Sequence, residues 1–508
     1  MFRDNQRKAG AVLSYLQILI HNLSGILYTP IMLRFLGQSE YGLYNLSAST
    51  ISYLGLLSFG INNSYVHFYS RYQADDDQRH IAKLNGVYLL ILCFIAIFAL
   101  GAGLILLNFL PEIFDKSLSL QEINKAKKLM FILMISLAVT FPASLFSSYI
   151  HVQEHFVFQR ILSLIKTFCS PFLTIPLLLM GYQSIALALI SMSTTIAESC
   201  VSVWYCLKKL KIQISFGQID WFLLKEIWIF SFFIFVNIFI DQVNGNLSKF
   251  LLGIYKGSVS VAIYGIASQL CTFYIQLSST FQTVFTPKIN RMVAEKNDNQ
   301  RLTILFTSVG RIQFMILFFF CLGYIFFGKP FIHFWAGDDY LSAYPIGLIL
   351  LISMTIPLIQ NLGIPIQQAK NKHQFWAVVC FLVSIFNLIV SIPLCKKYGG
   401  IGCSIGTSLS NIIGNGIFMN LYYHKKIGLD MKYFWLSILS IFPALIFPAI
   451  FGFVVTSFID LYQLGTLLIS GILFSLVFIS AIWFFAFNKS EKKICKPFLL
   501  YFRFSRYQ

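Results

Sequence analysis

The chain has 508 residues, of which 57% are hydrophobic and only 11% are Asp, Glu, Lys or Arg. Soluble domains carry about 25% charged residues, so this composition excludes both a water-soluble globule and a disordered chain. The formal net charge of +18 fits basic residues that hold loops on the cytoplasmic side of a membrane, and it predicts no nucleic-acid partner.

Apolar segments long enough to cross a membrane follow one another along the whole chain. A bilayer core of about 30 Å takes about 20 residues of helix. The pattern therefore predicts an all-α polytopic membrane protein with about 14 transmembrane helices. In chain order the predicted spans lie near residues 11–33, 41–66, 84–110, 129–150, 156–180, 184–207, 222–246, 259–287, 302–327, 341–364, 375–394, 402–423, 434–458 and 464–487.

Basic residues are distributed unevenly between the connections of these spans. If the N-terminus is cytoplasmic, the cytoplasmic segments hold 26 of the 38 Lys and Arg, and the external segments hold 10. An excess of Lys and Arg marks cytoplasmic loops, so both termini are predicted to be cytoplasmic. The ten Cys are scattered without a CxxC pair, which favours buried apolar side chains over a redox or metal role.

Polar residues recur on one helical face in three of the predicted spans. In lipid a polar side chain should face protein or water. Two interpretations stay open: the stripes line a hydrated cavity, or they join helices through hydrogen bonds. Asn62, at the end of the second span, belongs to the same group. The stripes are Ser14, Gln17, His21, Ser24 and Tyr28 in the first span, Asn237, Asp241, Asn244 and Ser248 in the seventh, and Gln269, Thr272, Gln276, Ser279 and Thr283 in the eighth.

Ionisable residues inside spans each need a partner, water or a ligand, because an unpaired charge at the bilayer centre costs about 3 kcal/mol or more. Lys166 and Glu198, on the fifth and sixth spans, are predicted to pair with each other. Arg311 lies in the first half of the ninth span, where its side chain either extends to the cytoplasmic surface or faces the cavity. Lys249 lies near the end of the seventh span.

One short motif suggests chemistry that the rest of the sequence does not support. His151-Val-Gln-Glu-His155 matches H-x-x-E-H, an inverted zinc-protease pattern. It falls in a short connection between two hydrophobic spans, and no third ligand stands near it in the sequence. The sequence therefore predicts solvated loop residues there and no metal. No phosphate loop, GxSxG serine or Rossmann glycine pattern occurs either, so we expect that the protein is not an enzyme.

The region after the first span carries a recognisable motif. Pro30-Ile-Met-Leu-Arg34-Phe-Leu-Gly37-Gln-Ser-Glu-Tyr41-Gly42-Leu-Tyr44 resembles the P-x-x-x-R-x-L-G-x-x-x-Y-G-x-Y signature of polysaccharide (O-antigen-type) flippases. These belong to the multidrug/oligosaccharidyl-lipid/polysaccharide (MOP) exporter superfamily. Further segments that are similar to the family's pattern are Leu57-Ser58-Phe-Gly60, Tyr69-Ser70-Arg71-Tyr72, Leu252-Gly253, Tyr264-Gly265 and Tyr398-Gly399-Gly400-Ile401-Gly402. One departure is Ser58, where many members carry Asp.

The resemblance implies an architecture. It implies two six-helix lobes, at residues 1–210 and 211–425, around a cavity lined by the first, second, seventh and eighth helices. Two further helices at 426–488 and a basic cytoplasmic tail at 489–508 would follow. It also implies residence in the bacterial cytoplasmic (inner) membrane.

The resemblance further implies a substrate, an oligosaccharide linked to a polyprenyl diphosphate, which alternating access would turn from the cytoplasmic to the periplasmic leaflet. The glycan would be a repeat unit of O-antigen in lipopolysaccharide, or of capsule or exopolysaccharide. Arg34, Lys249 and Arg311 are the cations expected to meet the diphosphate. For Arg34 two alternatives stay open, a helix-end position with the side chain extended to the membrane surface or an ion pair with Glu40. For His21 and Asp241 two roles stay open, binding of a coupling proton or Na⁺ or simple lining of the cavity, and no other cofactor is expected. Membrane lipid, a glycan polymerase and glycosyltransferases are the expected partners.

Three alternatives remain open on the sequence alone. A cation-coupled multidrug exporter of the same superfamily would favour acids in its cavity, and these spans offer few. A lipid II flippase is a closer variant of the same function. A membrane-embedded glycan polymerase or acyltransferase is another class, usually marked by a long external loop or by an intramembrane His–Asp pair.

Overall fold

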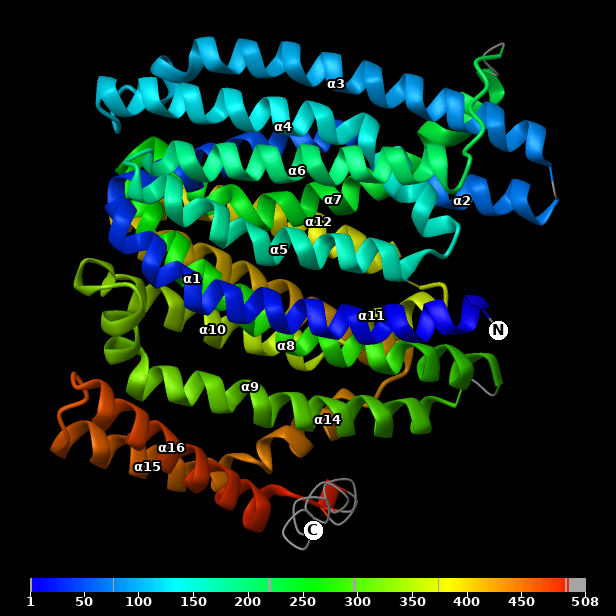
Figure 1. The fold of residues 1–508 in the computed structure, drawn as a ribbon. Helices are drawn as coiled ribbons and strands as arrows, with labels where there is room; N and C mark the ends of the chain where they lie inside the picture. Colours follow the sequence, from blue (N-terminus) through cyan, green and yellow to red (C-terminus); the bar gives the residue numbers. More distant parts are fainter. Residues whose placement is uncertain are drawn as a thin grey trace, which may run out of the picture. The chain divides into compact units, whose positions relative to one another are not determined.

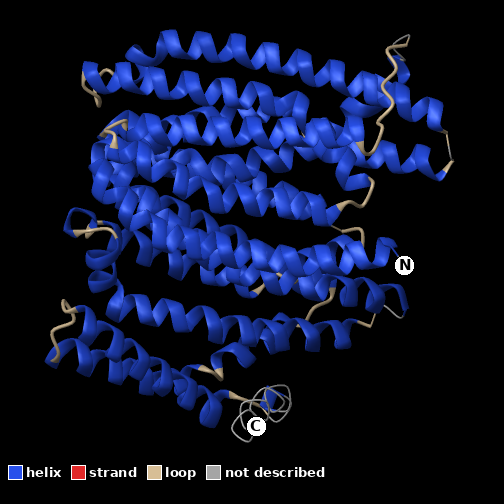
Figure 2. Cartoon of the chain, viewed as in Figure 1, coloured by secondary structure: helices blue, strands red, loops and turns tan. Residues whose placement is uncertain are grey.

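A computed structural model describes residues 2–75, 77–217, 221–295, 298–372, 374–488 and 491–492. Within these ranges all regular structure is helical, and Figure 2 shows helices joined by loops. Twelve helical runs in the described residues are long and apolar enough to cross a membrane. The predicted all-α membrane architecture is therefore confirmed. The predicted tail, 489–508, lies outside the described residues except for Glu491 and Lys492.

Two of these runs are far longer than one crossing needs. The run Leu16–Ala74 has 59 residues and the run Gln374–Ile427 has 54. Each contains a glycine in the left-handed region of φ, Gly37 at 72° and Gly399 at 58°, where the helix bends sharply. Since about 20 residues cross the bilayer core, each run has the length of two spans joined at its glycine. The number of fourteen crossings stays a prediction.

The first compact unit comprises Met1–Ile266 and Ser384–Gly406. Within it α4 packs against α3 and α6, and α1 packs against α4, α5, α6 and α7, as the labelled ribbons of Figure 1 indicate. Its helices are α1 (Phe2–Leu54), η1 (Gly55–Ser58), α2 (Ile61–Ala74), α3 (Gln78–Phe114), α4 (Leu120–Val152), α5 (Phe156–Leu179), α6 (Gln183–Lys208), α7 (Trp221–Lys256), the start of α8 (Ser258–Glu295) and part of α12 (Gln374–Asn411).

Tyrosines form the centre of the first unit's core. Tyr65 and Tyr88 are each about 99% buried or more, between α2, α3 and α4. The Tyr65 hydroxyl donates to Asn85 Oδ1 at 2.7 Å, and the Tyr88 hydroxyl bonds with Ser64 Oγ at 2.9 Å. A buried tyrosine needs such a partner for its hydroxyl, and the bonds fix how these helices pack.

The second compact unit comprises Ala267–Val383 and Thr407–Gln508. At its centre α9 packs against α10, α14, α15 and α16. Its helices are the rest of α8 and α12, α9 (Asn299–Trp335), η2 (Asp338–Tyr340), α10 (Ala343–Ile359), α11 (Gly363–Ala369), the π-helical segments η3 (Ile412–Phe418), η4 (Tyr423–Ile427) and η5 (Ile482–Ala486), α13 (Met419–Tyr422), α14 (Met431–Leu439), α15 (Phe442–Phe458) and α16 (Leu464–Ala481).

The division into compact units differs from the predicted lobes. The sequence assigned α7 and residues 384–406 to a second lobe, but both group with the first unit. Hydrogen bonds connect α7 to other helices of the first unit: Gln242 donates to Ser52 of α1, and Ser117 donates to the carbonyl of Gly253 at 2.6 Å. The chain boundary between two lobes, at residues 210 and 211, stays a prediction.

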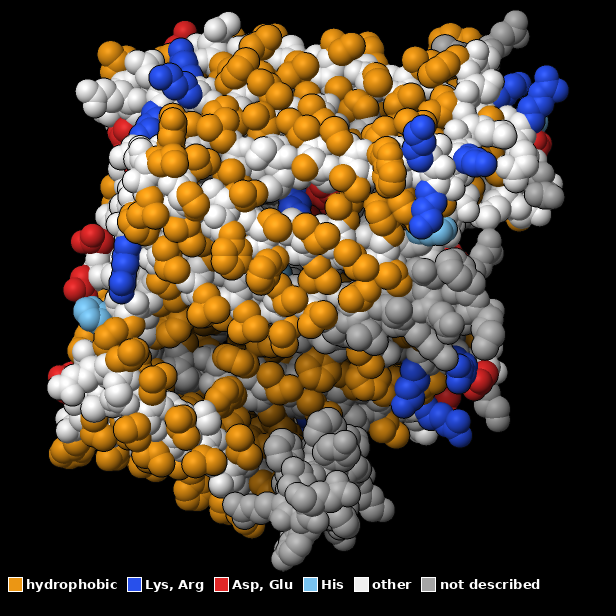
Figure 3. All heavy atoms as spheres, viewed as in Figure 1, with side chains coloured by type: hydrophobic (Ala, Val, Ile, Leu, Met, Phe, Trp, Pro, Cys, Tyr) orange, Lys and Arg blue, Asp and Glu red, His pale blue; other side chains and the backbone are white. Residues whose placement is uncertain are grey.

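Large exposed side chains in the middle of α3 are apolar. On α3 they include Phe94, Ile97 and Phe98, which are 69%, 70% and 56% exposed. Figure 3 shows apolar side chains over the middle of the helices on the face drawn, with Lys and Arg gathered near helix ends. This is the pattern that a bilayer core and its two polar surfaces require.

Candidate functional site

The exposed face of α7 carries the polar residues that the sequence assigned to a cavity. Asp241 and Asn244 are exposed there, and Lys249 is half-buried further along the helix. Asp241 lies about 22 Å from the end of α7 at Lys256, taking 1.5 Å per residue. A carboxylate at that depth costs about 3 kcal/mol against acyl chains. This face of α7 is therefore suited to a hydrated space.

The other face of α7 is apolar and lies toward neighbouring helices of the first unit. Val243, Leu247 and Phe250 line an apolar cavity of about 460 Å³ together with residues of α1, α3 and α12, among them Tyr53 and Ile385. Between the two faces, Asn244 accepts a long hydrogen bond of 3.5 Å from Ser384 of α12. The polar residues of α7 thus lie on a helix whose apolar side lines a cavity within the first unit.

The stripe on α1 is divided between helix contacts and exposure. Gln17 donates to Ser163 of α5 at 2.6 Å and accepts from Arg160 at 3.2 Å. Tyr28 is half-buried beside Thr174 of α5. His21, between them, is exposed. Gln17 therefore joins α1 to α5. The imidazole of His21, in contrast, is exposed and accessible to a ligand.

Asn62 takes part in a helix contact as well. Its Oδ1 accepts a hydrogen bond of 2.8 Å from Ser144 of α4. Asn237 of α7 is half-buried. Both residues lie in the first unit, where their amides are placed among neighbouring helices.

Lys166 of α5 and Glu198 of α6 form an ion pair. Nζ of Lys166 lies 2.8 Å from Glu198 Oε2, and it also donates to Thr195 at 3.1 Å. Each of the paired side chains is 34% exposed. The predicted partners are thus in contact, which gives each charge the partner that it needs inside a span and joins α5 to α6.

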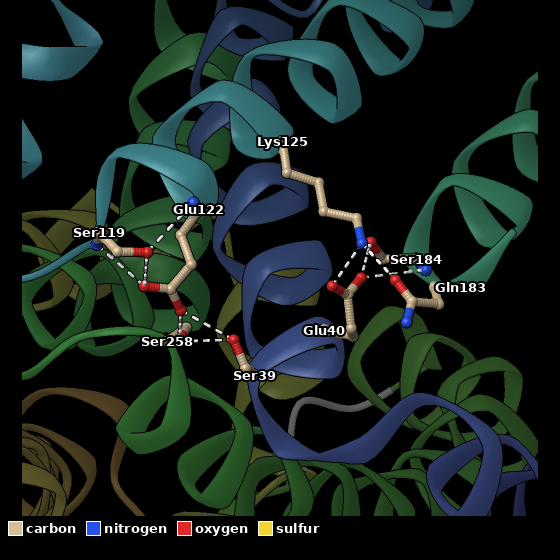
Figure 4. A network of polar contacts seen from close by, with 8 residues as sticks. All are labelled: Ser39, Glu40, Ser119, Glu122, Lys125, Gln183, Ser184 and Ser258. Atoms are coloured by element: carbon tan, nitrogen blue, oxygen red, sulfur yellow. Dashed lines mark hydrogen bonds and ion pairs between the residues drawn. The ribbon is translucent and has the colours of Figure 1, made fainter. Parts of the chain in front are cut away.

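A polar network that the sequence did not single out gathers at one end of the first unit (Figure 4). Glu122 lies at its centre: Oε1 accepts from Ser39 of α1 at 2.8 Å and from Ser258 of α8 at 2.6 Å. Oε2 accepts from the amide and the hydroxyl of Ser119, both at 3.0 Å, which forms a capping box at the start of α4. One carboxylate therefore joins the bend of α1 near Gly37 to the starts of α4 and α8.

A second carboxylate extends the network to α6. Glu40 accepts from Lys125 of α4 at 2.5 Å and from the hydroxyl of Ser184 at 2.5 Å, and Lys125 also bonds with Gln183 (Figure 4). The sequence left open whether Arg34 pairs with Glu40. In the structure Glu40 bonds with Lys125 and Ser184, and Arg34 is exposed. The guanidinium of Arg34 is thus open to a ligand or to lipid headgroups.

The motif glycine Gly42 lets α1 approach the start of α8. A Cβ atom at this position would lie 1.9 Å from the carbonyl oxygen of Ser258. No real contact is that short, so only glycine permits the backbones to meet as they do. The Tyr41-Gly42 part of the sequence signature therefore has a packing role beside the Glu122 network.

We expect that Gly42→Ala lowers the free energy of unfolding by about 1–3 kcal/mol, because the added methyl group overpacks a backbone contact. A thermal unfolding midpoint measured on the purified chain checks this. Gly101→Ala on α3 is the matched control, since nothing lies within 4 Å of a Cβ built at Gly101. A midpoint for Gly42→Ala equal to that of the control would show that the two backbones are not held together.

We also expect that Glu122→Gln weakens the joint between α1, α4 and α8, since charged hydrogen bonds to the serines become neutral ones. A loss of about 1–3 kcal/mol in unfolding free energy follows from the weaker bonds. Glu112→Gln, which changes an exposed carboxylate near the end of α3, is the control for charge alone. Equal thermal unfolding midpoints for Glu122→Gln and Glu112→Gln would contradict the role of Glu122 in joining α1, α4 and α8.

The eighth and ninth predicted spans place their polar residues in the second unit. Gln269 and Gln276 of α8 are half-buried, and Oε1 of Gln276 is buried without a hydrogen-bond partner among the described residues. Gln276 can therefore still accept a hydrogen bond, as a sugar hydroxyl or water would supply.

Arg311 of α9 has surroundings that the sequence did not predict. Its side chain is 5% exposed and lies 2.8 Å from Glu491 Oε1, whose side chain is 7% exposed. The guanidinium also donates to Ser440 Oγ at 2.8 Å and to the carbonyl of Ala486 at 2.7 Å. The sequence predicted that Arg311 faces a cavity or the cytoplasmic surface. In the structure it instead forms a buried ion pair with Glu491. Its donors are used to join α9 to α14 and to the segment after η5.

The H-x-x-E-H motif lies in the turn between α4 and α5. His155 bonds through Nδ1 with the Tyr205 hydroxyl at 2.9 Å, and burial together with the nearby Lys209 lowers the pKa of the His155 imidazole. Over the described parts of the chain, no three His, Cys, Asp or Glu side chains are grouped as a metal site.

The signals for the missed residues were present but weak. Ser119 and Glu122 have the S-x-x-E spacing of a capping box, which could have placed the start of α4. That spacing says nothing of Ser258, which is 136 residues further along the chain. Glu491 was hidden for a similar reason, because 180 residues separate it from Arg311.

Comparisons with known proteins identify a family by its sequence profile and a fold by solved structures. The profile of a family described as "Polysaccharide biosynthesis protein" matches residues 8–293, which is more than half of the chain. A search of the curated proteins found no match.

Solved structures share the fold at low sequence identity. A structure titled "Lipid II flippase MurJ, inward closed conformation" is 18% identical, with a TM-score of 0.70, covering 93% of this chain and 98% of that chain. An inward-facing multidrug resistance MATE family transporter of the MOP superfamily is 12% identical, with a TM-score of 0.61, covering 81% and 94%. The Vibrio cholerae MATE transporter VcmN in the bent form is 14% identical, with a TM-score of 0.53, covering 84% and 98%.

The helical architecture and the apolar surface are those of a membrane protein, and they agree with the family match. The chain belongs to the polysaccharide biosynthesis protein family and has the fold of the MOP superfamily transporters.

Proposed function

We propose that the protein is a flippase that moves a polyprenyl-diphosphate-linked oligosaccharide from the cytoplasmic to the periplasmic leaflet of the bacterial inner membrane by alternating access. The glycan is a repeat unit of O-antigen, capsule or exopolysaccharide, made by glycosyltransferases before transport and joined by a polymerase afterwards. The family match supports a role in polysaccharide biosynthesis, and the fold supports a transporter. The substrate is the one that the resemblance to O-antigen-type flippases implies, and the exposed polar residues fit its chemistry.

The observation that carries the proposal is the exposed Asp241 deep within α7. A sugar headgroup offers many hydroxyls, and carboxylates and amides such as Asp241 and Asn244 accept and donate hydrogen bonds to hydroxyls. The diphosphate needs cations, for which Arg34, exposed, and Lys249, half-buried, are at hand. The apolar tail needs no polar groups and stays in the lipid.

The membrane potential favours this direction of transport. A potential of about 100 mV, negative inside, is worth roughly 2.3 kcal/mol per charge. Two outward-moving negative charges would gain about 4.6 kcal/mol. Coupling to a proton or Na⁺ at His21 or Asp241 would add to this gain without being required by it.

A reconstituted assay tests the proposal. The purified chain is placed in vesicles that carry a fluorescent polyprenyl-diphosphate oligosaccharide, and an impermeant quencher reports which leaflet holds the headgroup. We expect transfer that depends on the protein and rises with an applied potential of the stated sign. Absence of transfer, with transfer of lipid II or of a cationic dye in parallel vesicles, would overturn the proposed substrate.

A further inference from the structure

A cavity of about 510 Å³ lies in the second unit. It forms where the end of α8, the start of α9, the turn after α11 and the segment η4 meet. We name it the lysine pocket, defined by Lys370, Lys372, Lys425, Lys426, Asn299 and Asn371. Its volume falls within the range of about 300–1,000 Å³ that is typical of small-molecule sites.

Hydrogen bonds hold the two lysine-bearing segments together. Lys370 Nζ donates to the carbonyl of Ile427 at 2.9 Å and to Asn299 Oδ1 at 2.5 Å. Lys372 Nζ donates to the carbonyl of Lys426 at 2.9 Å. Lys370 thus bonds to the residue that follows Lys426, and Lys372 bonds to the backbone of Lys426 itself. These bonds hold positively charged side chains near one another.

The tyrosines that connect the two lysine-bearing segments are buried or half-buried. Tyr423, which is 3% exposed, accepts a hydrogen bond of 3.1 Å from Gln367, and this bond ties η4 to α11. The Tyr422 hydroxyl donates to the carbonyl of Lys372 at 2.8 Å, and its ring stacks on Phe375 at 4.2 Å. The turn and η4 are thus fixed to each other on their inner side, while Lys372, Lys425 and Lys426 are exposed on the outer side.

No acidic side chain lines the pocket in the described part of the chain. Two acids on neighbouring elements are engaged elsewhere: Asp298 caps α9 and lies 3.4 Å from Arg301, and Asp430 caps α14 through the amide of Tyr433. A third, Glu295 at the end of α8, is exposed and does not line the pocket. Burial, with the charge of Lys372 beside it, lowers the pKa of Lys370. The pocket therefore holds an excess of positive charge that a bound anion would balance.

We propose that the lysine pocket binds a phosphate-bearing headgroup. Ammonium groups bind phosphate oxygens as compact charges, and the amides of Asn299 and Asn371 add neutral donors. The three connections that form the pocket are ones that the charge pattern assigns to the cytoplasmic side, where basic pockets between helices meet anionic lipids. The ligand class is a phosphate monoester, diester or diphosphate, carried by a phospholipid, by the polyprenyl substrate or by free phosphate.

Binding to the purified full chain in neutral detergent tests this proposal. The probes are dihexanoyl phosphatidylglycerol, a short-chain polyprenyl diphosphate and inorganic phosphate, with dihexanoyl phosphatidylcholine as the zwitterionic reference. The variant is Lys425→Gln with Lys426→Gln, because neither side chain forms a hydrogen bond or ion pair with another described residue. Lys432→Gln on α14 is the matched control, an exposed lysine that does not line the pocket.

We expect at least one anionic probe to raise the thermal midpoint of the wild type and of the Lys432→Gln control. The double Gln variant should bind that probe more than tenfold more weakly, since each lysine near an anionic lipid contributes about 1 kcal/mol and 1.4 kcal/mol is tenfold. The probe that binds tightest identifies the source of the phosphate. Lys425→Arg with Lys426→Arg should retain binding, which separates loss of charge from misfolding.

Two results would overturn the proposal. One is equal affinity of the double Gln variant, the control and the wild type for every anionic probe. The other is binding of phosphatidylcholine as tight as that of phosphatidylglycerol in the wild type. Neither outcome depends on transport, so the proposed flippase function could fail while the lysine pocket stands, or the reverse.

Discussion

Asp241→Ala is expected to reduce surface glycan at least tenfold while the protein still folds and reaches the membrane. Asp241 is exposed deep within α7, and no ion pair in the described residues engages it. Its removal takes away a carboxylate that would bind sugar hydroxyls or a coupling ion, and a lost charged hydrogen bond costs about 1.5–3 kcal/mol. The measurement is surface glycan in cells that depend on this protein, with the membrane-bound amount of each variant determined in parallel.

The matched control for Asp241→Ala is Glu295→Ala, which removes an exposed carboxylate at the end of α8. We expect normal glycan from this variant. Arg34→Ala should resemble Asp241→Ala, because Arg34 is the exposed cation expected to meet the diphosphate. Normal surface glycan with both Asp241→Ala and Arg34→Ala would contradict the roles proposed for these residues.

Glu491→Ala is expected to lower the free energy of unfolding by about 3–5 kcal/mol, the largest effect on stability that we predict. Arg311 and Glu491 are 5% and 7% exposed, and the variant leaves the guanidinium of Arg311 buried without its counter-charge. The thermal unfolding midpoint of the purified chain measures the loss. The same variant should loosen α14 from α9, since Arg311 also bonds to the carbonyl of Ser437 and to Ser440.

Two controls sharpen this prediction. Arg311→Leu combined with Glu491→Leu removes both charges together and should recover much of the loss, because an apolar replacement of a buried pair is often neutral. Arg301→Ala breaks an exposed pair with Asp298, 3.4 Å apart, and should change stability by less than about 1 kcal/mol. A Glu491→Ala midpoint no lower than that of Arg301→Ala would contradict a buried pair.

The membrane architecture followed from the sequence because it depends on local composition. Each span has its own run of apolar residues, and lipid allows few structures other than a helix for such a run. Gly37 and Gly399 were harder to place, since a sequence does not reveal that two spans continue through a bend as a single helical run.

The polar residues were found by their periodicity, but periodicity does not tell what they face. Gln17, on the same helical face as His21, bonds to α5, whereas His21 is exposed. Lys166 and Glu198 could be paired from the sequence because they are rare opposite charges on consecutive spans. Arg311 and Glu491 could not, since nothing local links residues 180 positions apart.

The polar face of α7 is tested most directly by its access to water. Asp241→Cys is introduced into a chain whose ten native cysteines are replaced and which still supports surface glycan, and intact cells are treated with a hydrophilic thiol reagent. Ile97→Cys is the control, in the middle of α3 with a side chain 70% exposed on an apolar surface. We expect that the cysteine at position 241 reacts quickly and is protected by the lipid-linked glycan, while the cysteine at position 97 stays unmodified. Slow reaction at both positions would mean that acyl chains, and not water, cover this face of α7.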